Sequence, residues 1–163
     1  LAQKLKTPAS VITMSRSVNE SVPQFLAQKT IAEVLKSGPM MTQTPMDIAI
    51  LGAAFKENVP DTRNSKVNDL AIELEKFGCR VHVVDECADA ETFSHEYNRQ
   101  IVPFDQLPRC HAVIIAVRHD SFVKKFSAER IKGKLRPPFV VLDFKEMLKP
   151  EIAESIGLNV IRI

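Results

Sequence analysis

The sequence predicts an α/β protein in which a doubly wound, mostly parallel sheet of six strands follows a helical segment. Two observations lead to this prediction. From residue 46 onward, short apolar runs rich in β-branched residues alternate with amphipathic stretches, which is the pattern of strands joined by helical crossovers. Before residue 46, apolar residues recur at steps of three and four, which is typical of helix. The crossovers are expected to be right-handed.

The first part of the chain, residues 1–36, is predicted to be helical. Pro8 should separate two helices, because proline lacks the amide hydrogen that a helix interior needs. Pro23 should kink the second helix or begin a further one. The Gly38-Pro39 pair should end it, and a linker without periodicity follows.

The rest of the chain contains the predicted strands, which are apolar and rich in β-branched residues. In order they are residues 46–51, 80–84, either 101–102 or 103–104, 111–117, 139–143 and 159–163. Helices are expected at 66–77 and 88–97, from residue 120, and at 150–156. A strand order of 3-2-1-4-5-6 would place Leu51 beside Val117, with a crevice between the loops that follow them.

The loop after the first predicted strand, from Gly52 to Ser65, is the main candidate for a binding site. It has about a dozen residues, whereas βα connections usually have ~2–6, and ligands of parallel sheets bind at the carboxyl ends of the strands. A dinucleotide-binding loop would have the pattern G-x-G-x-x-G, but Ala54 and Glu57 replace its second and third glycines. The strand–loop–helix unit is therefore Rossmann-like without being a usual NAD site.

Composition and charge exclude several classes of protein. The 163-residue chain has a net charge of +2 and 45% hydrophobic residues, enough to build the core of one domain. The balanced charge gives no support to nucleic acid binding, and no apolar run is long enough to predict a membrane span. Cys79, Cys87 and Cys110 show no metal-ligand spacing, and neither do the histidines, so no metal is predicted. The odd number of cysteines fits a reducing cytoplasm.

The candidate loop also carries a family signature. Gly52-Ala53-Ala54-Phe55-Lys56, followed by Asp61-Thr62-Arg63-Asn64-Ser65, resembles the G-x-A-F-K…D-x-R-x-S signature of the UDP-glucose/GDP-mannose dehydrogenase family. The stretch FKENVPDTRNSKV is most similar to the branch that oxidises C6 of UDP-N-acetylhexosamines for surface polysaccharides. The likeness covers most of residues 46–163, with a thinner match over residues 1–40.

The resemblance implies an organisation and a function. Residues 1–40 would be the end of a central helical region that forms a homodimer, and residues 41–163 a UDP-sugar-binding Rossmann-like domain. The whole enzyme would oxidise a UDP-sugar to the uronic acid by two NAD-dependent hydride transfers, through intermediates covalently bound to a cysteine. Because the family's nucleophilic cysteine and NAD-binding domain precede the matching segment, we expect no catalytic residue in this chain and no activity from it alone.

The resemblance also assigns individual residues. Phe55 and Lys56 would contact the UDP-sugar, Lys145 would approach the nucleotide, and Arg63 would reach the nicotinamide side of NAD. For Phe55, Lys56 and Lys145, the chemistry of the residue type also allows a role without a ligand. Phe55 can be a core residue, and the two lysines can be solvated.

For three side chains, the sequence leaves two possible roles open. Arg63 can instead pair with Asp61 or Glu57 and stiffen the loop. Asp85 ends the second predicted strand, where it can bind a ribose diol or cap the following turn. His119 follows the fourth predicted strand and can act as an acid or base, or as a hydrogen-bonding loop residue.

Two other functions remain open at this stage, and so does the identity of the sugar. The chain can be a stand-alone Rossmann-like module that senses a nucleotide, or an oligomerisation piece with a vestigial pocket. The sequence does not distinguish among UDP-GlcNAc, UDP-GalNAc, UDP-ManNAc and UDP-glucose, because the resemblance places most of the sugar-contacting residues upstream of the matching segment.

Overall fold

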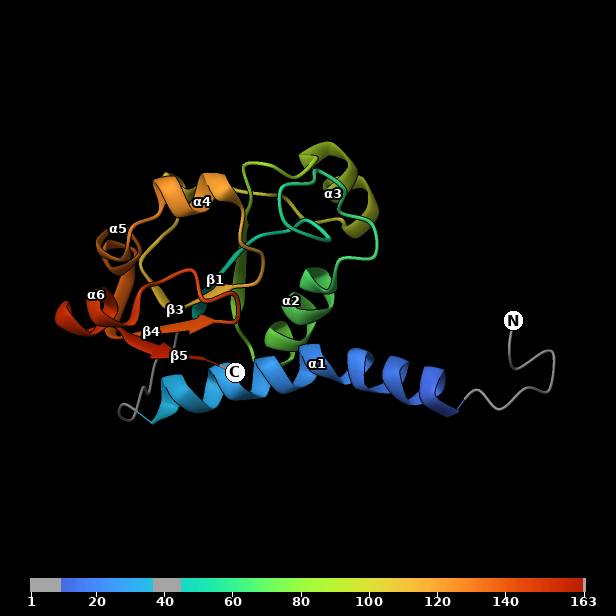
Figure 1. Ribbon diagram of the computed structural model, residues 1–163, viewed down its shortest axis with the longest axis horizontal. Helices are drawn as coiled ribbons and strands as arrows, with labels where there is room; N and C mark the ends of the chain where they lie inside the picture. Colours follow the sequence, from blue (N-terminus) through green and yellow to red (C-terminus); the bar gives the residue numbers. More distant parts are fainter. Residues whose placement is uncertain (1–9, 37–44, 163) are drawn as a thin grey trace.

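The computed structural model describes residues 10–36 and 45–162, which contain a parallel sheet flanked by helices (Figure 1). The strands are β1 (Asp47–Leu51), β2 (Arg80–Val84), β3 (Cys110–Ile115), β4 (Leu135–Asp143) and β5 (Asn159–Ile161). All pairings are parallel, in the order β2-β1-β3-β4-β5. The helices are α1 (Ser10–Leu35), α2 (Lys66–Lys76), α3 (Ala90–Tyr97), α4 (Asp120–Lys125), α5 (Ala128–Gly133) and α6 (Pro150–Ser155), with a 3-10 turn at Phe104–Gln106.

The α/β prediction is confirmed, but the third of the six predicted strands, at residues 101–102 or 103–104, is not formed in the described part of the chain. Ile101 makes only an isolated parallel bridge to Val83, at the edge of the sheet next to β2. Pro103 follows closely, and proline has no amide hydrogen with which to continue a ladder. The observed strand order is therefore the predicted one with its third strand reduced to a single bridge.

Two apolar clusters form the core, one on each face of the sheet. Successive residues of a strand point to opposite faces, so Ile50 packs with Leu74 of α2 and Ala27 of α1, whereas Leu51 packs with Phe122 of α4. Strands β1 and β3 are buried along their whole length. Burial on both faces explains why these strands are continuous apolar runs in the sequence.

Helix α1 runs along one side of the molecule and is a single helix that contains Pro23. Of the two alternatives predicted at Pro23, a kink or the start of a further helix, the second is wrong. Tertiary packing offsets the hydrogen bond that proline removes, because Ala27 and Val34, which follow it, are buried in the core. The predicted break at Pro8 and the predicted end at Gly38-Pro39 lie outside the described residues.

The other face of α1 leaves an apolar stripe exposed. Met14, Val18, Val22 and Phe25 are spaced so that they share one face of the helix, and their exposed fractions are 68%, 65%, 37% and 51%. Leu26, the neighbour of Phe25, packs against the core instead. These four side chains therefore form an apolar strip that faces solvent along α1.

Candidate functional site

The carboxyl ends of β1 and β3 lie side by side, as the sequence predicted. The amides of Ala116 and Val117 both donate to the carbonyl oxygen of Leu51, at 2.9 and 3.2 Å. Gly52 makes this close approach possible, because a Cβ at this position would lie 2.5 Å from the Cβ of Val117. Its φ of +103° is also a backbone conformation that other residues rarely adopt. The loop after β1 therefore begins directly against the loop after β3.

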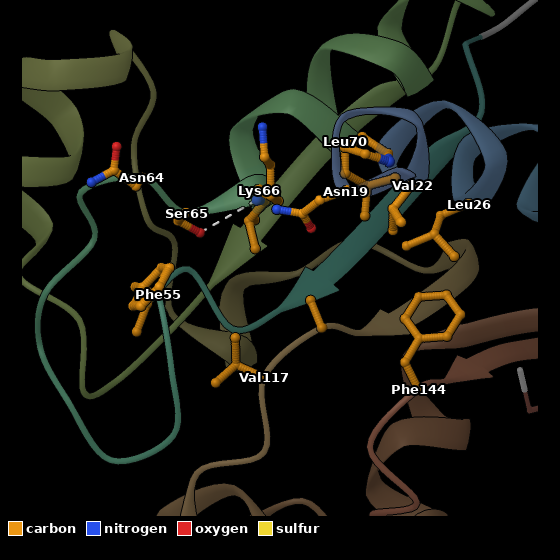
Figure 2. Close-up of a pocket in the computed structure, with 14 residues that line it drawn as sticks. Asn19, Val22, Leu26, Phe55, Asn64, Ser65, Lys66, Leu70, Val117 and Phe144 are labelled. Atoms are coloured by element: carbon orange, nitrogen blue, oxygen red, sulfur yellow. Dashed lines mark hydrogen bonds between the residues drawn. The ribbon is translucent and has the colours of Figure 1, made fainter. Parts of the chain in front are cut away.

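A groove of about 440 Å³ opens beside this junction, a volume typical of small-molecule sites (Figure 2). It lies between α1, the start of α2 and the loops that follow β1, β3 and β4. The residues that line it are Asn19, Val22, Pro23, Leu26, Ala54, Phe55, Asn64, Ser65, Lys66, Val67, Leu70, Ala116, Val117 and Phe144. Most of the lining is apolar, and a few polar side chains stand at its margin.

The start of α2 is fixed by Ser65, its N-cap residue. The hydroxyl oxygen of Ser65 accepts a hydrogen bond from the amide of Val67, at 3.3 Å. This bond satisfies one of the amides that the first helical turn leaves unpaired. Because Ser65 also lines the groove, the cap holds one wall of the groove in place.

Phe55 and the two candidate lysines lie around the loop after β1. Phe55 lines the groove and is 59% exposed, so it is not a core residue. Lys56 is exposed on the same loop, beyond the groove. Lys145 follows β4, and its Nζ lies 4.0 Å from Oε1 of Glu57. Of these three residues, only Phe55 lines the groove, and Lys145 approaches the same loop at Glu57.

The loop that carries Lys145 is held by a buried carboxylate. Asp143 ends β4 and is 1% exposed. Its Oδ1 accepts from the amides of Lys145 and Met147, at 3.2 and 3.1 Å, and its Oδ2 accepts from the amide of Leu148, at 2.8 Å. The backbone at Lys145 is therefore fixed, while its side chain remains exposed.

Arg63 lies away from the groove and forms a two-pronged ion pair. Its Nε and Nη2 lie 2.9 and 2.8 Å from the two carboxylate oxygens of Asp61. The hydrogen bond from Arg63 lowers the pKa of Asp61 to about 2. Of the two partners that the sequence allowed, Asp61 is the observed one. Arg63 borders a separate shallow depression beside Glu91 and Thr92 of α3.

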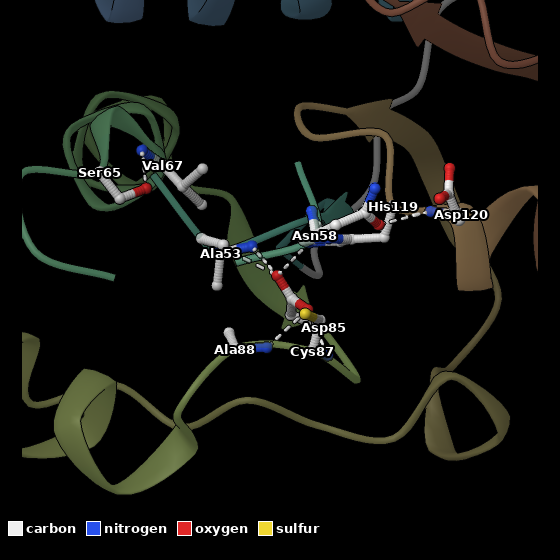
Figure 3. Close-up of polar contacts among 10 residues, drawn as sticks. Ala53, Asn58, Ser65, Val67, Asp85, Cys87, Ala88, His119 and Asp120 are labelled. Atoms are coloured by element: carbon white, nitrogen blue, oxygen red, sulfur yellow. Dashed lines mark hydrogen bonds and ion pairs between the residues drawn. The ribbon is translucent and has the colours of Figure 1, made fainter. Parts of the chain in front are cut away.

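Asp85 accepts hydrogen bonds from the turn after β1 and from the turn after β2 (Figure 3). Its Oδ2 accepts from the amides of Ala53 and Ala54, at 2.7 and 3.1 Å, and its Oδ1 accepts from the amides of Cys87 and Ala88, at 2.8 and 3.0 Å. In dinucleotide-binding loops, amides at the first turn face the pyrophosphate. Here a carboxylate occupies them, which leaves Asp85 as a turn cap and not as a ribose ligand.

His119 joins the same network and is completely buried. Its Nε2 lies 3.1 Å from Oδ2 of Asp85, and its Nδ1 accepts from the amide of Asn58 at 2.9 Å. Because Nδ1 accepts a hydrogen bond, the ring proton is on Nε2 and points to Asp85. Both ring nitrogens are engaged, so the hydrogen-bonding alternative for His119 is confirmed. The sequence placed both residues after strands but gave no sign of their contact.

Burial and hydrogen bonding act on Asp85 in opposite directions. Burial of the carboxyl group raises its pKa, whereas the hydrogen bonds from His119 and from the amides of Ala53 and Cys87 lower it. The hydrogen bonds prevail, and the pKa of Asp85 lies below its usual value. The carboxylate is therefore ionised at neutral pH and remains a strong acceptor.

Residues 10–36 and 45–162 bring together no cluster of His, Cys, Asp and Glu side chains fit to hold a metal ion. None of the helices described there is both long enough and apolar enough to cross a membrane. Cys79, Cys87 and Cys110 are free thiols.

Comparisons with known proteins agree on one family. Residues 49–150 match the UDP binding domain of the UDP-glucose/GDP-mannose dehydrogenase family. UDP-N-acetyl-D-glucosamine 6-dehydrogenase of Salmonella typhi is 33% identical over 143 residues, which are 86% of this chain and 32% of that protein. UDP-N-acetyl-D-mannosamine dehydrogenase of Methanococcus maripaludis (strain C7) is 28% identical over 158 residues, which are 93% of this chain and 34% of that protein.

Solved structures show the same fold. The structure of UDP-D-ManNAc dehydrogenase from Pyrococcus horikoshii superposes with a TM-score of 0.76 at 22% identity, and the match covers 100% of this chain and 35% of that one. The chain thus spans about a third of the length of the relatives it matches.

Proposed function

The chain belongs to the UDP-glucose/GDP-mannose dehydrogenase family, and on that premise we propose that it is the carboxyl-terminal, UDP-sugar-binding part of an NAD-dependent nucleotide-sugar 6-dehydrogenase. The observation that carries this proposal is the groove at the carboxyl ends of β1 and β3, with the exposed ring of Phe55 in its wall. The substrate would be a UDP-N-acetylhexosamine or a UDP-hexose. The whole enzyme would oxidise its C6 alcohol to the acid for polysaccharide synthesis.

The cysteines of this chain support the assignment of the catalytic nucleophile to another segment of that enzyme. Burial raises the pKa of the Cys79 thiol to about 11 and that of Cys110 to about 12. Burial also raises the pKa of Cys87. A thiol is nucleophilic only as the thiolate, so none of the three suits covalent catalysis at neutral pH. We assign the nucleophile and the main NAD contacts to other segments of the enzyme, and we expect this chain alone to be inactive.

The site residues divide between two ligands. Phe55 offers a ring face to the base or sugar of UDP, and Lys56 and Lys145 approach its diphosphate as point charges. Arg63 stands on a different surface from the groove, which fits an interaction with NAD and not with UDP. Its pairing with Asp61 would hold the guanidinium ready for that ligand.

The helical segment is proposed to form a homodimer. Residues 1–40 would belong to this dimerisation region, and residues 41–163 to a doubly wound UDP-binding domain. The exposed stripe of Met14, Val18 and Phe25 on α1 supports an association through this helix. The three free thiols fit a reducing cytoplasm, where we place the enzyme.

Calorimetric titration with UDP tests the proposal. The wild-type chain should bind UDP weakly, with an affinity that falls as salt is added, because part of the attraction is between exposed charges. Lys56→Ala should weaken binding by about 1.5–3 kcal/mol, as expected for a hydrogen bond to a charged group. Arg63→Ala should leave the affinity for UDP unchanged.

Lys76→Ala is the matched control, because it removes the same charge from an exposed position at the far end of α2. Equal losses in Lys56→Ala and Lys76→Ala would reveal only a general effect of charge. No binding of UDP by the wild-type chain would contradict the proposed function itself.

A further inference from the structure

The loop that carries Phe55 and Lys56 is closed at its base. The amide of Phe55 donates to the carbonyl oxygen of Asp61 at 2.8 Å. On the later side of the loop, the amide of Asp89 donates to the carbonyl oxygen of Pro60 at 2.9 Å, and Tyr97 Oη donates to the carbonyl oxygen of Thr62 at 3.0 Å. These bonds tie the later half of the loop to the segment that leads into α3 and to α3 itself.

The earlier half of the loop is held at Asn58. Its amide donates to Nδ1 of His119 at 2.9 Å, and its Oδ1 accepts from the amide of Asp120 at 2.9 Å. The ion pair between Glu57 and Lys145, at 4.0 Å between exposed groups, adds little. Lys56 thus lies between the closure at Phe55 and the anchor at Asn58.

The geometry of the anchor requires one form of the imidazole ring. Asn58 has a φ of +59°, a left-handed conformation that asparagine tolerates better than most residues. Its amide can donate to Nδ1 only if Nδ1 carries no proton. Asp85 secures that form, because it accepts the proton on Nε2 and is itself held by four backbone amides.

We propose that His119 is a positioning residue of the UDP-sugar site. Oriented by Asp85, its neutral ring holds Asn58 and thereby fixes the segment that presents Phe55 and Lys56 to the ligand. His119 is completely buried and acts only through this segment. The inference rests on the proposed function, since it takes UDP as the ligand of the loop.

Two substitutions of His119 separate its two hydrogen bonds. The shorter amide side chain of His119→Asn places an oxygen near the position of Nδ1, so it keeps an acceptor for Asn58 and loses the donor to Asp85. The longer side chain of His119→Gln places its NH₂ group near the position of Nε2, so it keeps the donor and loses the acceptor. His119→Asn removes one of the hydrogen bonds to Oδ2 of Asp85, and His119→Gln removes the acceptor of the Asn58 amide. Each variant thus loses one hydrogen bond, so both should lose stability to a similar extent.

UDP titration and urea unfolding of both variants give the test. His119→Asn should bind UDP with nearly wild-type affinity, whereas His119→Gln should bind about tenfold more weakly, the effect of losing about one hydrogen bond. A purely structural role predicts instead that affinity follows stability in both variants. That outcome, or wild-type affinity in both, would overturn the inference.

Two measurements keep the inference testable if His119→Gln does not fold. Long-range ¹H–¹⁵N NMR of the wild-type chain should show His119 neutral with its proton on Nε2; a proton on Nδ1 would overturn the inference. Asn58→Gly keeps both the amide and the left-handed backbone, so it should keep UDP affinity, and a tenfold loss would contradict the role of the amide. If the wild-type chain binds no UDP, the proposed function fails, and the NMR result still reports on the anchor.

Discussion

Replacing Gly52 with alanine should destabilise the junction between the loops after β1 and β3. A side chain at a φ of +103° costs about 1–2 kcal/mol. The new Cβ would also lie 2.5 Å from the Cβ of Val117 and 2.7 Å from its backbone nitrogen. That nitrogen cannot move aside freely, because it donates to Leu51, so overpacking adds about 1–3 kcal/mol. The free energy of unfolding should fall by about 2–5 kcal/mol in total.

Gly78→Ala is the matched control for this substitution. Gly78 has a φ of +77°, but no atom lies within 4 Å of the place where its Cβ would stand. The control therefore has the backbone cost alone, about 1–2 kcal/mol. Urea unfolding followed by circular dichroism measures both losses, and with a slope of about 2 kcal/mol per M the midpoint of Gly52→Ala should fall by about 1–2.5 M. Equal losses in the two variants would refute the argument that the contact with Val117 matters.

Three other predictions follow from the site and from α1. Asp143→Ala should cost several kcal/mol in urea unfolding, because three loop amides lose their acceptor; a loss below about 1 kcal/mol would contradict this. The pKa of Asp85 lies below its usual value of 3.8, so the stability that its carboxylate contributes is present above about pH 4 and is lost as the pH falls through the folded-state pKa. Asp85→Asn should lack this acid-dependent loss. Deleting residues 1–40 should convert a dimer into a monomer in sedimentation, and an unchanged mass would exclude α1 as the interface.

The parallel sheet and the neighbouring positions of Leu51 and Val117 could be predicted because they depend on local pattern and general topology. Strands buried on both faces are apolar throughout, and crossover helices fix their direction. The predicted order also held apart from its third strand. A short apolar run does not show whether Ile101 begins a strand or makes only one bridge. The outcome depends on how many backbone amides the prolines after Ile101 remove from the hydrogen-bonded ladder.

The helix through Pro23 could not be predicted from local propensity. Proline in a helix interior costs about 3 kcal/mol in isolation, so the sequence argued for a kink or a new start. The core supplies the compensation, because Ala27 and Val34 are buried against the sheet and α2. These contacts are distant in sequence, and such packing routinely overrides propensity.

The sequence predicted which strand ends come together, but not the hydrogen bonds between the loops that follow them. The loops after parallel strands were expected to meet at one edge of the sheet, and the loops after β1 and β3 do so. Arg63 was assigned to a ligand by resemblance, and the structure adds its pairing with Asp61. Which polar atoms bond to which depends on angstrom-scale distances between loops, and neither spacing nor composition shows these.

The missing glycines and the buried network have one physical explanation. The turn after β1 has amides that could bind a phosphate, but Asp85 occupies those of Ala53 and Ala54. With these amides occupied, the second glycine of a dinucleotide loop has no pyrophosphate to approach, and alanine is tolerated there. We propose that the ligand is bound by the part of the loop that follows, residues 55–58, which needs an anchor of its own. His119 supplies that anchor and takes its orientation from the same carboxylate, so one buried acid both closes the usual phosphate site and supports the site that we propose in its place.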